Sequence, residues 1–211
     1  MSASSYRLYA RKGAGSLAPQ MLLEEIGAAY ELVWVSKTPA DIDAFRRVSP
    51  AAKIPVLVLP DGTVISESAA ILIHLTDVNP AAALAPASGS SAHARFLQWM
   101  VFLSANVYEA LLRYFYSQRY SAAGEAAAAQ IKIQALADWT GHLQTAHAAL
   151  SPYVLGAELS AADHYLYMLA SWYPPDEEAA LASRLPKLRH HAELMQRRPA
   201  TRKAQKDHGE S

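Results

Sequence analysis

The hydrophobic pattern of the chain changes once, at a stretch between residues 79 and 91 that is rich in Pro, Ala, Gly and Ser. Before it, short β-branched and aromatic runs alternate with segments of helical spacing, whereas after it only helical spacing is found. This change predicts a mixed sheet with helices, followed by an all-helical part. We therefore expect an α+β fold with one domain at residues 1–80, a linker at 81–91 and an all-α domain at 92–211.

The first domain should open with a strand, a helix and a second strand, and this order implies a parallel pair with a right-handed crossover. A hairpin is expected later, because two apolar runs flank Pro60-Asp61-Gly62. The expected elements are a strand at Tyr6–Ala10, a helix at Ser16–Ala28, a strand at Tyr30–Val35, a helix capped by Thr38 or Asp41 and stopped by Ser49-Pro50, the hairpin, and a helix at Ser66–Asp77.

The second domain should consist of helices alone. Ser160 and Asp163 form a capping box that opens one of them, and Pro174-Pro175 ends it. The other expected helices are one with the apolar stripe Phe96, Trp99, Met100, Leu103, Val107, Leu111 and Tyr114, a long one at Glu125–Leu150, and two shorter ones divided near Leu185-Pro186. The basic tail from Arg197 to Lys206 is expected to be a solvated helix end that frays.

Composition excludes several classes of function. Lys plus Arg and Asp plus Glu both number 19, so the chain lacks the basic footprint of a nucleic-acid binder. We expect no membrane span, because no apolar run reaches about 18 residues, and a cytoplasmic location, because the N-terminus does not resemble a secretory signal. The absence of cysteine excludes disulfides, thiolate metal sites and a protein thiol nucleophile. The histidines lack metal-ligand spacing, so no metal is expected.

The segment Arg11–Pro19, "RKGAGSLAP", joins the first strand to the first helix. It lacks the third glycine and the Gly-Lys-Ser/Thr ending of a phosphate loop. Ser16 can instead be the cap of the helix, with Pro19 in its first turn. A hydroxyl and unpaired N–H groups at a helix start also hold anions, thiolates included, so a cap and a chemical role are compatible.

Two further segments have a structural and a functional interpretation. Ile54-Pro55 can be an ordinary trans bond at a strand start, or a cis turn that presents the Ile54 main chain to a peptide-like ligand. Glu67-Ser68 can be a helix start capped by Ser66 or Ser68, or a place where a carboxylate meets N–H groups and an amine meets the glutamate.

Together these motifs resemble the cytosolic glutathione S-transferases over nearly the whole chain. "KIPVLVLPDGTVISESAAILIHL" is the most specific part, "GAELSAADHYLYMLASW" resembles the family's capping box, "QRRPATRKA" resembles its closing helix, and "LYARKGAGSLAP" is most similar to the bacterial beta class. The resemblance implies a thioredoxin-like domain that binds glutathione as co-substrate, an all-α domain, and a homodimer. By position, Ile54, Glu67 and Ser68 would hold glutathione, with Lys53 and Lys37 as further candidates for its carboxylates.

The sequence departs from the beta class at three positions. The family's cysteine falls on Gly15, its histidine on Tyr108, and its glutamate that reaches the partner's ligand on Asn106, which we keep as a glutathione-binding candidate. Chemistry through a mixed disulfide with the protein is therefore excluded. A hydroxyl together with a helix N-terminus can favour the glutathione thiolate instead, and Ser16, Tyr108 and Tyr9 are the candidate hydroxyls.

Tyr9 lies one residue out of phase with the tyrosine of Tyr-type classes, which turns its side chain to the other face of the strand. Arg11 can contribute electrostatically whichever hydroxyl acts. The resemblance further implies an electrophile pocket, although aromatic residues at helical spacing also form ordinary cores. Its expected lining is Arg11, Tyr108, Leu112, Phe115, Tyr116 and Trp172.

The leading functional prediction is a glutathione transferase that acts on small hydrophobic electrophiles, as in detoxification. A glutathione-dependent isomerase, ether lyase or dehalogenase on the same fold is an alternative. A non-catalytic binding or regulatory protein is another, because the family's cysteine, histidine and glutamate are replaced.

Overall fold

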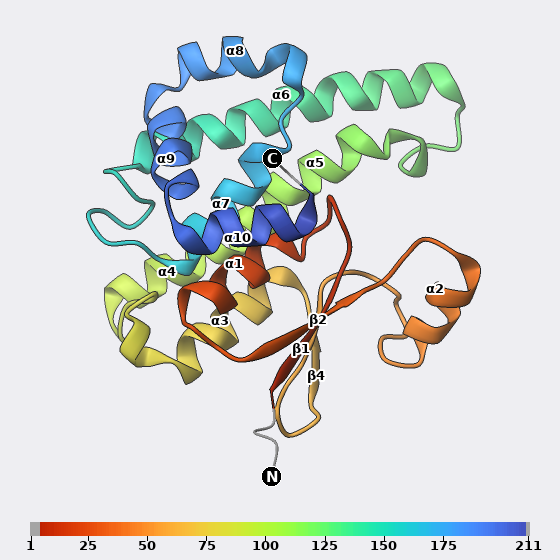
Figure 1. The fold of residues 1–211 in the computed structure, drawn as a ribbon. Helices are drawn as coiled ribbons and strands as arrows, with labels where there is room; N and C mark the ends of the chain where they lie inside the picture. Colours follow the sequence, from red (N-terminus) through yellow and green to blue (C-terminus); the bar gives the residue numbers. More distant parts are fainter. Residues whose placement is uncertain (1–4, 210–211) are drawn as a thin grey trace. The chain divides into compact units, whose positions relative to one another are not determined.

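The computed structural model describes residues 5–209 and divides the chain into two compact units. Unit 1 comprises residues 1–85 together with 195–211, and unit 2 comprises residues 86–194 (Figure 1). The sequence pattern predicts this last segment as part of the helical domain instead. Within residues 5–209, no helix has the length and apolar character that crossing a membrane requires.

Unit 1 is built on a four-stranded sheet with the strand order β2-β1-β3-β4. The strands are β1 (Tyr6–Ala10), β2 (Tyr30–Trp34), β3 (Val56–Val58) and β4 (Val64–Ser66). β1 runs parallel to β2 and antiparallel to β3, with Leu8 opposite Leu32 on one side and Leu57 on the other. Leu8 and Leu57 are fully buried, so the centre of the sheet is also the centre of the core.

Helices cover both faces of this sheet (Figure 1). α1 (Leu17–Glu25) and α3 (Ser68–Val78) pack together on one face, and a single 3₁₀ turn, η1 (Pro80–Ala82), follows α3. α2 (Pro39–Arg46) lies on the other face, where Phe45 packs into a small cluster with Val35 and Val56. Thr38 caps α2 by accepting a hydrogen bond from the Asp41 N–H at 3.3 Å, as one of the two predicted caps. The predicted thioredoxin-like arrangement is confirmed.

The basic tail forms an ordered helix, so the prediction that it frays is wrong. α10 (Pro199–His208) starts with proline in its first turn and packs along α1. Its buried residues recur at helical spacing and are small or weakly polar, which is why hydropathy alone gave no core signal. They are Ala200, Thr201, Ala204 and His208.

Unit 2 is helical, as predicted. Its segments are α4 (Ser91–Phe102), the π-helix η2 (Leu103–Val107), α5 (Tyr108–Phe115), the 3₁₀ turn η3 (Ser117–Arg119), α6 (Glu125–Ala149), α7 (Ala161–Ser171), α8 (Pro175–Arg184) and α9 (Pro186–Gln196) as far as Leu194. The predicted capping box at Ser160 and Asp163 is present. The π-helix was not predicted, and it separates two α-helices where the sequence showed one apolar stripe.

Candidate functional site

The turn between β1 and α1 is closed by the Ser16 side chain. Ser16 Oγ accepts from the Arg11 main-chain N–H at 3.2 Å and donates to the Arg11 carbonyl at 3.3 Å. Ser16 is fully buried and is the N-cap residue of α1, as predicted, but its side chain makes no cap bond to the helix. Its hydroxyl faces back into the turn and fixes the conformation of residues 11–16.

The start of α3 is tied to the same turn. Ser68 is 4% exposed, and its Oγ donates to the Gly15 carbonyl at 3.1 Å. Neither Ser66 nor Ser68 caps α3, because the N-cap residue is Glu67 and it makes no side-chain cap bond. The interpretation of these serines as caps is therefore wrong, and the Ser68 hydroxyl joins the start of one helix to the turn before another.

Glu67 has a main-chain conformation that residues other than glycine rarely adopt, with φ 68° and ψ 116°. Its side chain is exposed, and it sits directly before the first-turn N–H groups of α3, which have no partners within the helix. Strained residues of this kind concentrate at ligand-binding sites, where the surrounding structure holds them in place.

The strand register brings the Ile54 main chain to the same place. β1 pairs with β3 through Tyr9 opposite Val56, and β3 pairs with β4 through Val56 opposite Ser66. The segments that precede Val56 and follow Tyr9 and Ser66 therefore lie at the same end of the sheet, and they carry Ile54, the turn from Arg11, and Glu67-Ser68. The Ile54-Pro55 bond is cis. The predicted glutathione-binding residues Ile54, Glu67 and Ser68 thus gather at one edge of unit 1.

The lysines and Tyr9 are placed differently. Lys37 and Lys53 are both exposed, at the segments that follow β2 and precede β3. The Tyr9 ring packs on Phe45, with 5.3 Å between ring centroids, in the cluster under α2. Tyr9 therefore points to the face of the sheet opposite α1, as its phase along the strand predicted.

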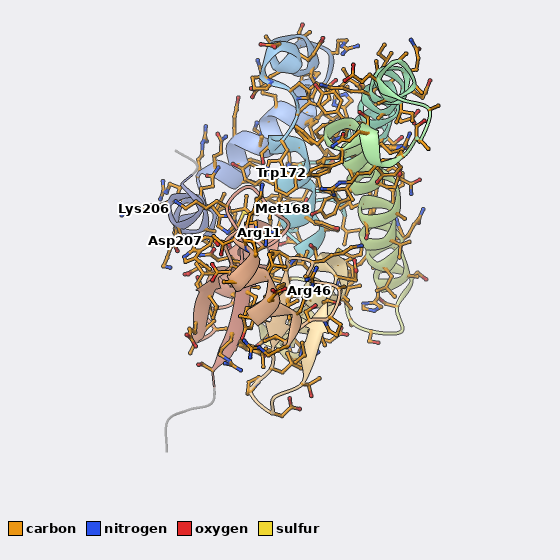
Figure 2. All side chains as sticks on the ribbon, turned by 90° about the vertical axis from the view of Figure 1, so that its right-hand side faces the viewer. Arg11, Arg46, Met168, Trp172, Lys206 and Asp207 are labelled. Carbon is orange, nitrogen blue, oxygen red and sulfur yellow. The ribbon has the colours of Figure 1, made fainter. Side chains whose placement is uncertain are left out.

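Arg11 is anchored to the end of β2. Its Nε donates to the Val35 carbonyl at 3.0 Å, and a terminal nitrogen donates to the Ser36 carbonyl at 3.3 Å. The charge is therefore held at the base of the turn. Figure 2 shows Arg11 within unit 1, in which Lys206 and Asp207 mark the end of α10.

In unit 2, two of the predicted pocket residues lie against each other. Tyr108 is the first residue of α5, and its ring packs on Trp172 and Tyr165, with ring-centroid distances of 6.1 and 6.3 Å respectively. Trp172 follows the end of α7, and its buried indole N–H has no hydrogen-bond partner among residues 5–209. Asn106 lies in the π-helix just before Tyr108, a type of segment that is frequent at functional sites.

The remaining pocket candidates lie further along α5. Leu112 is half-buried, Phe115 is 48% exposed, and the Phe115 ring contacts Trp139, with 6.2 Å between centroids. The Tyr116 ring lies under the Arg119 guanidinium, 4.1 Å from it. Tyr108 and Leu112 are four residues apart and share one side of the helix.

Comparison with known proteins identifies the family. The model of the glutathione S-transferase N-terminal domain matches residues 16–78. A sphingomonad glutathione S-transferase, solved in complex with glutathione, is 34% identical over 97% of this chain and all of its own, with a TM-score of 0.75. The chain belongs to the glutathione S-transferase family. A bacterial beta-class enzyme from Sphingomonas chungbukensis is 30% identical over 97% of this chain and 100% of its own, with a TM-score of 0.82.

A curated relative gives the same answer over most of the chain. Glutathione S-transferase GstA from Escherichia coli O157:H7 is 26% identical over 90% of this chain and 91% of its own length. Among the described residues, no group of three or more His, Asp or Glu side chains is placed to hold a metal ion.

The sequence did not predict a buried polar network that joins α1, β2 and α10. Gln20 is fully buried in α1, and its Nε2 donates to the Tyr30 hydroxyl at 3.1 Å and to Asp207 at 2.8 Å. The Tyr30 hydroxyl donates to Glu24, and burial together with this bond raises the pKa of Tyr30 to about 12. Lys203 binds Glu24 at 2.7 Å, which raises the pKa of the lysine. The one sequence signal for this network is the polar residue Gln20 within an otherwise apolar helical segment.

Proposed function

We propose that this protein binds glutathione on unit 1 and adds its thiolate to small hydrophobic electrophiles. The observation that carries the proposal is that Ile54, strained Glu67 and Ser68 lie at the same end of the sheet as the turn at residues 11–16, to which Ser68 is hydrogen-bonded, in a member of this family. In this proposal the Ile54 main chain pairs with the cysteinyl part of glutathione, as in strand addition. Glu67 and the start of α3 hold the γ-glutamyl end, and Lys37 and Lys53 attract its carboxylates.

The thiolate needs about 1.4 kcal/mol of preferential stabilisation for each pKa unit below its usual value of about 8.5. Ser16 is fully buried, and its hydroxyl is bonded to the Arg11 main chain. We therefore assign Ser16 to holding the turn. The positive end of the α1 dipole and the anchored Arg11 charge then stabilise the sulfur, and Tyr108 is tested beside them as the remaining candidate hydroxyl.

Retention on immobilised glutathione, followed by elution with free glutathione, tests binding. Conjugation of chlorodinitrobenzene, a generic aryl halide, tests catalysis. The ultraviolet absorbance of bound thiolate against pH then compares the variants Ser16→Ala, Tyr108→Phe and Tyr9→Phe. Tyr9→Phe is expected to leave the titration unchanged. Loss of retention in the wild-type protein would overturn the proposal.

A non-catalytic glutathione-binding protein is the second candidate. Two observations favour it. Gly15, Tyr108 and Asn106 stand where the beta class has its cysteine, histidine and glutamate, and the Ser16 hydroxyl is already hydrogen-bonded to the Arg11 main chain. Retention on glutathione without any conjugation would select it. Activity with isomerase, ether lyase or dehalogenase substrates but not with aryl halides would select those reactions instead.

The cellular setting belongs to the same proposal. We infer a homodimer that acts in cytoplasmic detoxification, on the basis of the family's usual assembly and role. Light scattering after size-exclusion chromatography tests the assembly, and the expected mass is twice that of the 22.9 kDa chain.

A further inference from the structure

The ring of His208 is enclosed at the end of α10. His208 is 2% exposed, and neither ring nitrogen has a hydrogen-bond partner among residues 5–209. The ring meets Trp34 edge-on, with 5.2 Å between centroids and 72° between planes. A buried polar side chain without partners is costly, so a reason for its retention is expected.

The neighbours of His208 belong to the turn and its anchor. Trp34 ends β2, directly before the Val35 and Ser36 carbonyls that hold the Arg11 guanidinium. Lys12 lies over Gly209, where an added Cβ would come within 3.3 Å of Lys12 Nζ. The end of α10 therefore touches the turn itself and the strand end to which the turn is bound.

The rest of α10 is fastened to α1. Asp207 accepts from Gln20 at 2.8 Å, and the Gln20 main-chain N–H in turn bonds to the Ser16 carbonyl at 3.1 Å. Arg198 pairs with Glu25 at the other end of the contact. Movement of the α10 end would thus reach residues 11–16 through Lys12, through Trp34 and through Gln20.

The charged groups that face the ring are Lys12 from the turn and Asp207 from α10 itself, while Trp34 from β2 is neutral. Burial lowers the pKa of His208 to about 4, Lys12 acts in the same direction, and Asp207 opposes both. The enclosed ring is therefore uncharged at neutral pH. Protonation would put a second cation beside Lys12 in a space without a partner for it.

We propose that His208 is a positioning residue. Packing of the α10 end against Trp34 and Lys12, here called the brace, holds the turn at residues 11–16 in place, and the brace holds only while the His208 ring is uncharged. The second half of the inference, that release of the brace weakens binding of glutathione, rests on the proposed function. The brace itself depends only on the packing of α10 against Trp34 and Lys12.

Hydrogen exchange tests the brace without any ligand. A released ring regains its ordinary pKa of about 6.5, so opening of the α10 end should become up to about 20-fold more favourable between about pH 7 and about pH 5. Protection factors of the last α10 amides and of Arg11 should fall by up to that factor in the wild type. In His208→Phe, which keeps a ring against Trp34 but cannot take a proton, they should not change with pH. Equal pH dependence in both proteins would overturn the proposal.

Binding of S-methylglutathione tests the functional half, because this probe has no thiol to titrate. His208→Ala should raise its Kd at least about threefold at neutral pH, since only the competent fraction binds. The matched control is Thr201→Ala, which alters another fully buried α10 side chain whose hydroxyl has no partner among the described residues, about two turns before His208 along the helix. His208→Phe should keep the wild-type Kd and remove its rise at acid pH.

The outcomes separate the two ideas. If neither the wild type nor any variant binds the probe at any pH, the proposed function fails and the exchange data still decide the brace. If the wild type binds but His208→Ala and Thr201→Ala behave alike, or if Arg11 keeps its protection in His208→Ala, the positioning role is wrong.

Discussion

Replacing Glu67 with glycine should stabilise the fold and weaken glutathione binding at the same time. The residue is held at φ 68° and ψ 116°, outside the regions that side chains favour. Such a conformation costs about 1–3 kcal/mol. Glycine removes this cost but makes the unfolded chain more flexible, which takes back about 0.4–1 kcal/mol. The net expectation is a gain of about 1 kcal/mol in the free energy of unfolding.

Glu67→Ala is the matched control because it also removes the carboxylate but keeps a Cβ. It should retain the main-chain cost, so Glu67→Gly should exceed Glu67→Ala by about 1–2 kcal/mol in urea unfolding. In thermal unfolding each kcal/mol corresponds to about 2–4 °C for a chain of this size. The exposed carboxylate contributes little to stability by itself.

Binding should change in the opposite direction and equally in both variants. Loss of a charge-assisted hydrogen bond to the ligand amine costs about 1.5–3 kcal/mol, or about 10- to 100-fold in the Kd for glutathione measured by calorimetry. A glycine variant no more stable than the alanine variant would refute the strain argument. Wild-type affinity in both variants would refute the assignment of Glu67 to the ligand.

Three further perturbations follow from the structure. Asp163→Asn should lower the free energy of urea unfolding by about 3 kcal/mol or more, because the fully buried carboxylate accepts from the Val154 and Ser160 N–H groups and lies 3.1 Å from His191; a loss below about 1 kcal/mol would contradict this. The pKa of Tyr30 is raised above that of the unfolded chain, so its contribution is complete below about pH 10 and is lost by about pH 12; Tyr30→Phe should remove that part of the alkaline decline in stability. Gly15→Cys should form a mixed disulfide with oxidised glutathione, releasing one reduced glutathione, and an unchanged intact mass would argue against a thiol site at Gly15.

Most elements could be predicted because their signals are local. The alternating runs, the Pro60-Asp61-Gly62 turn and the Ser160–Asp163 capping box each depend on residues that are near one another in the sequence. The gathering of Ile54 with Ser68 was also within reach, because it follows from strand register once the hairpin is placed. Strand register does not predict the hydrogen-bond partners of the serine hydroxyls.

The serines illustrate that limit. Ser16 and Ser68 both stand at helix starts, where local statistics favour a cap. In the structure their hydroxyls bond instead to the Arg11 and Gly15 main chain, partners fixed by how α1, α3 and the turn meet. The π-helix at Leu103–Val107 is similar, since nothing in its composition differs from the α-helices on either side.

The last helix changes how the first turn should be understood. Lys12 belongs to the turn between β1 and α1, and its side chain extends to Gly209 at the end of α10. Gln20, Trp34 and His208 join the same contact from three different elements. A turn of six residues with two glycines has little rigidity of its own, because glycine leaves the main chain its widest freedom. Its geometry therefore depends on the Ser16 hydroxyl, which closes the turn, and on contacts from outside it, from Ser68 and from α10.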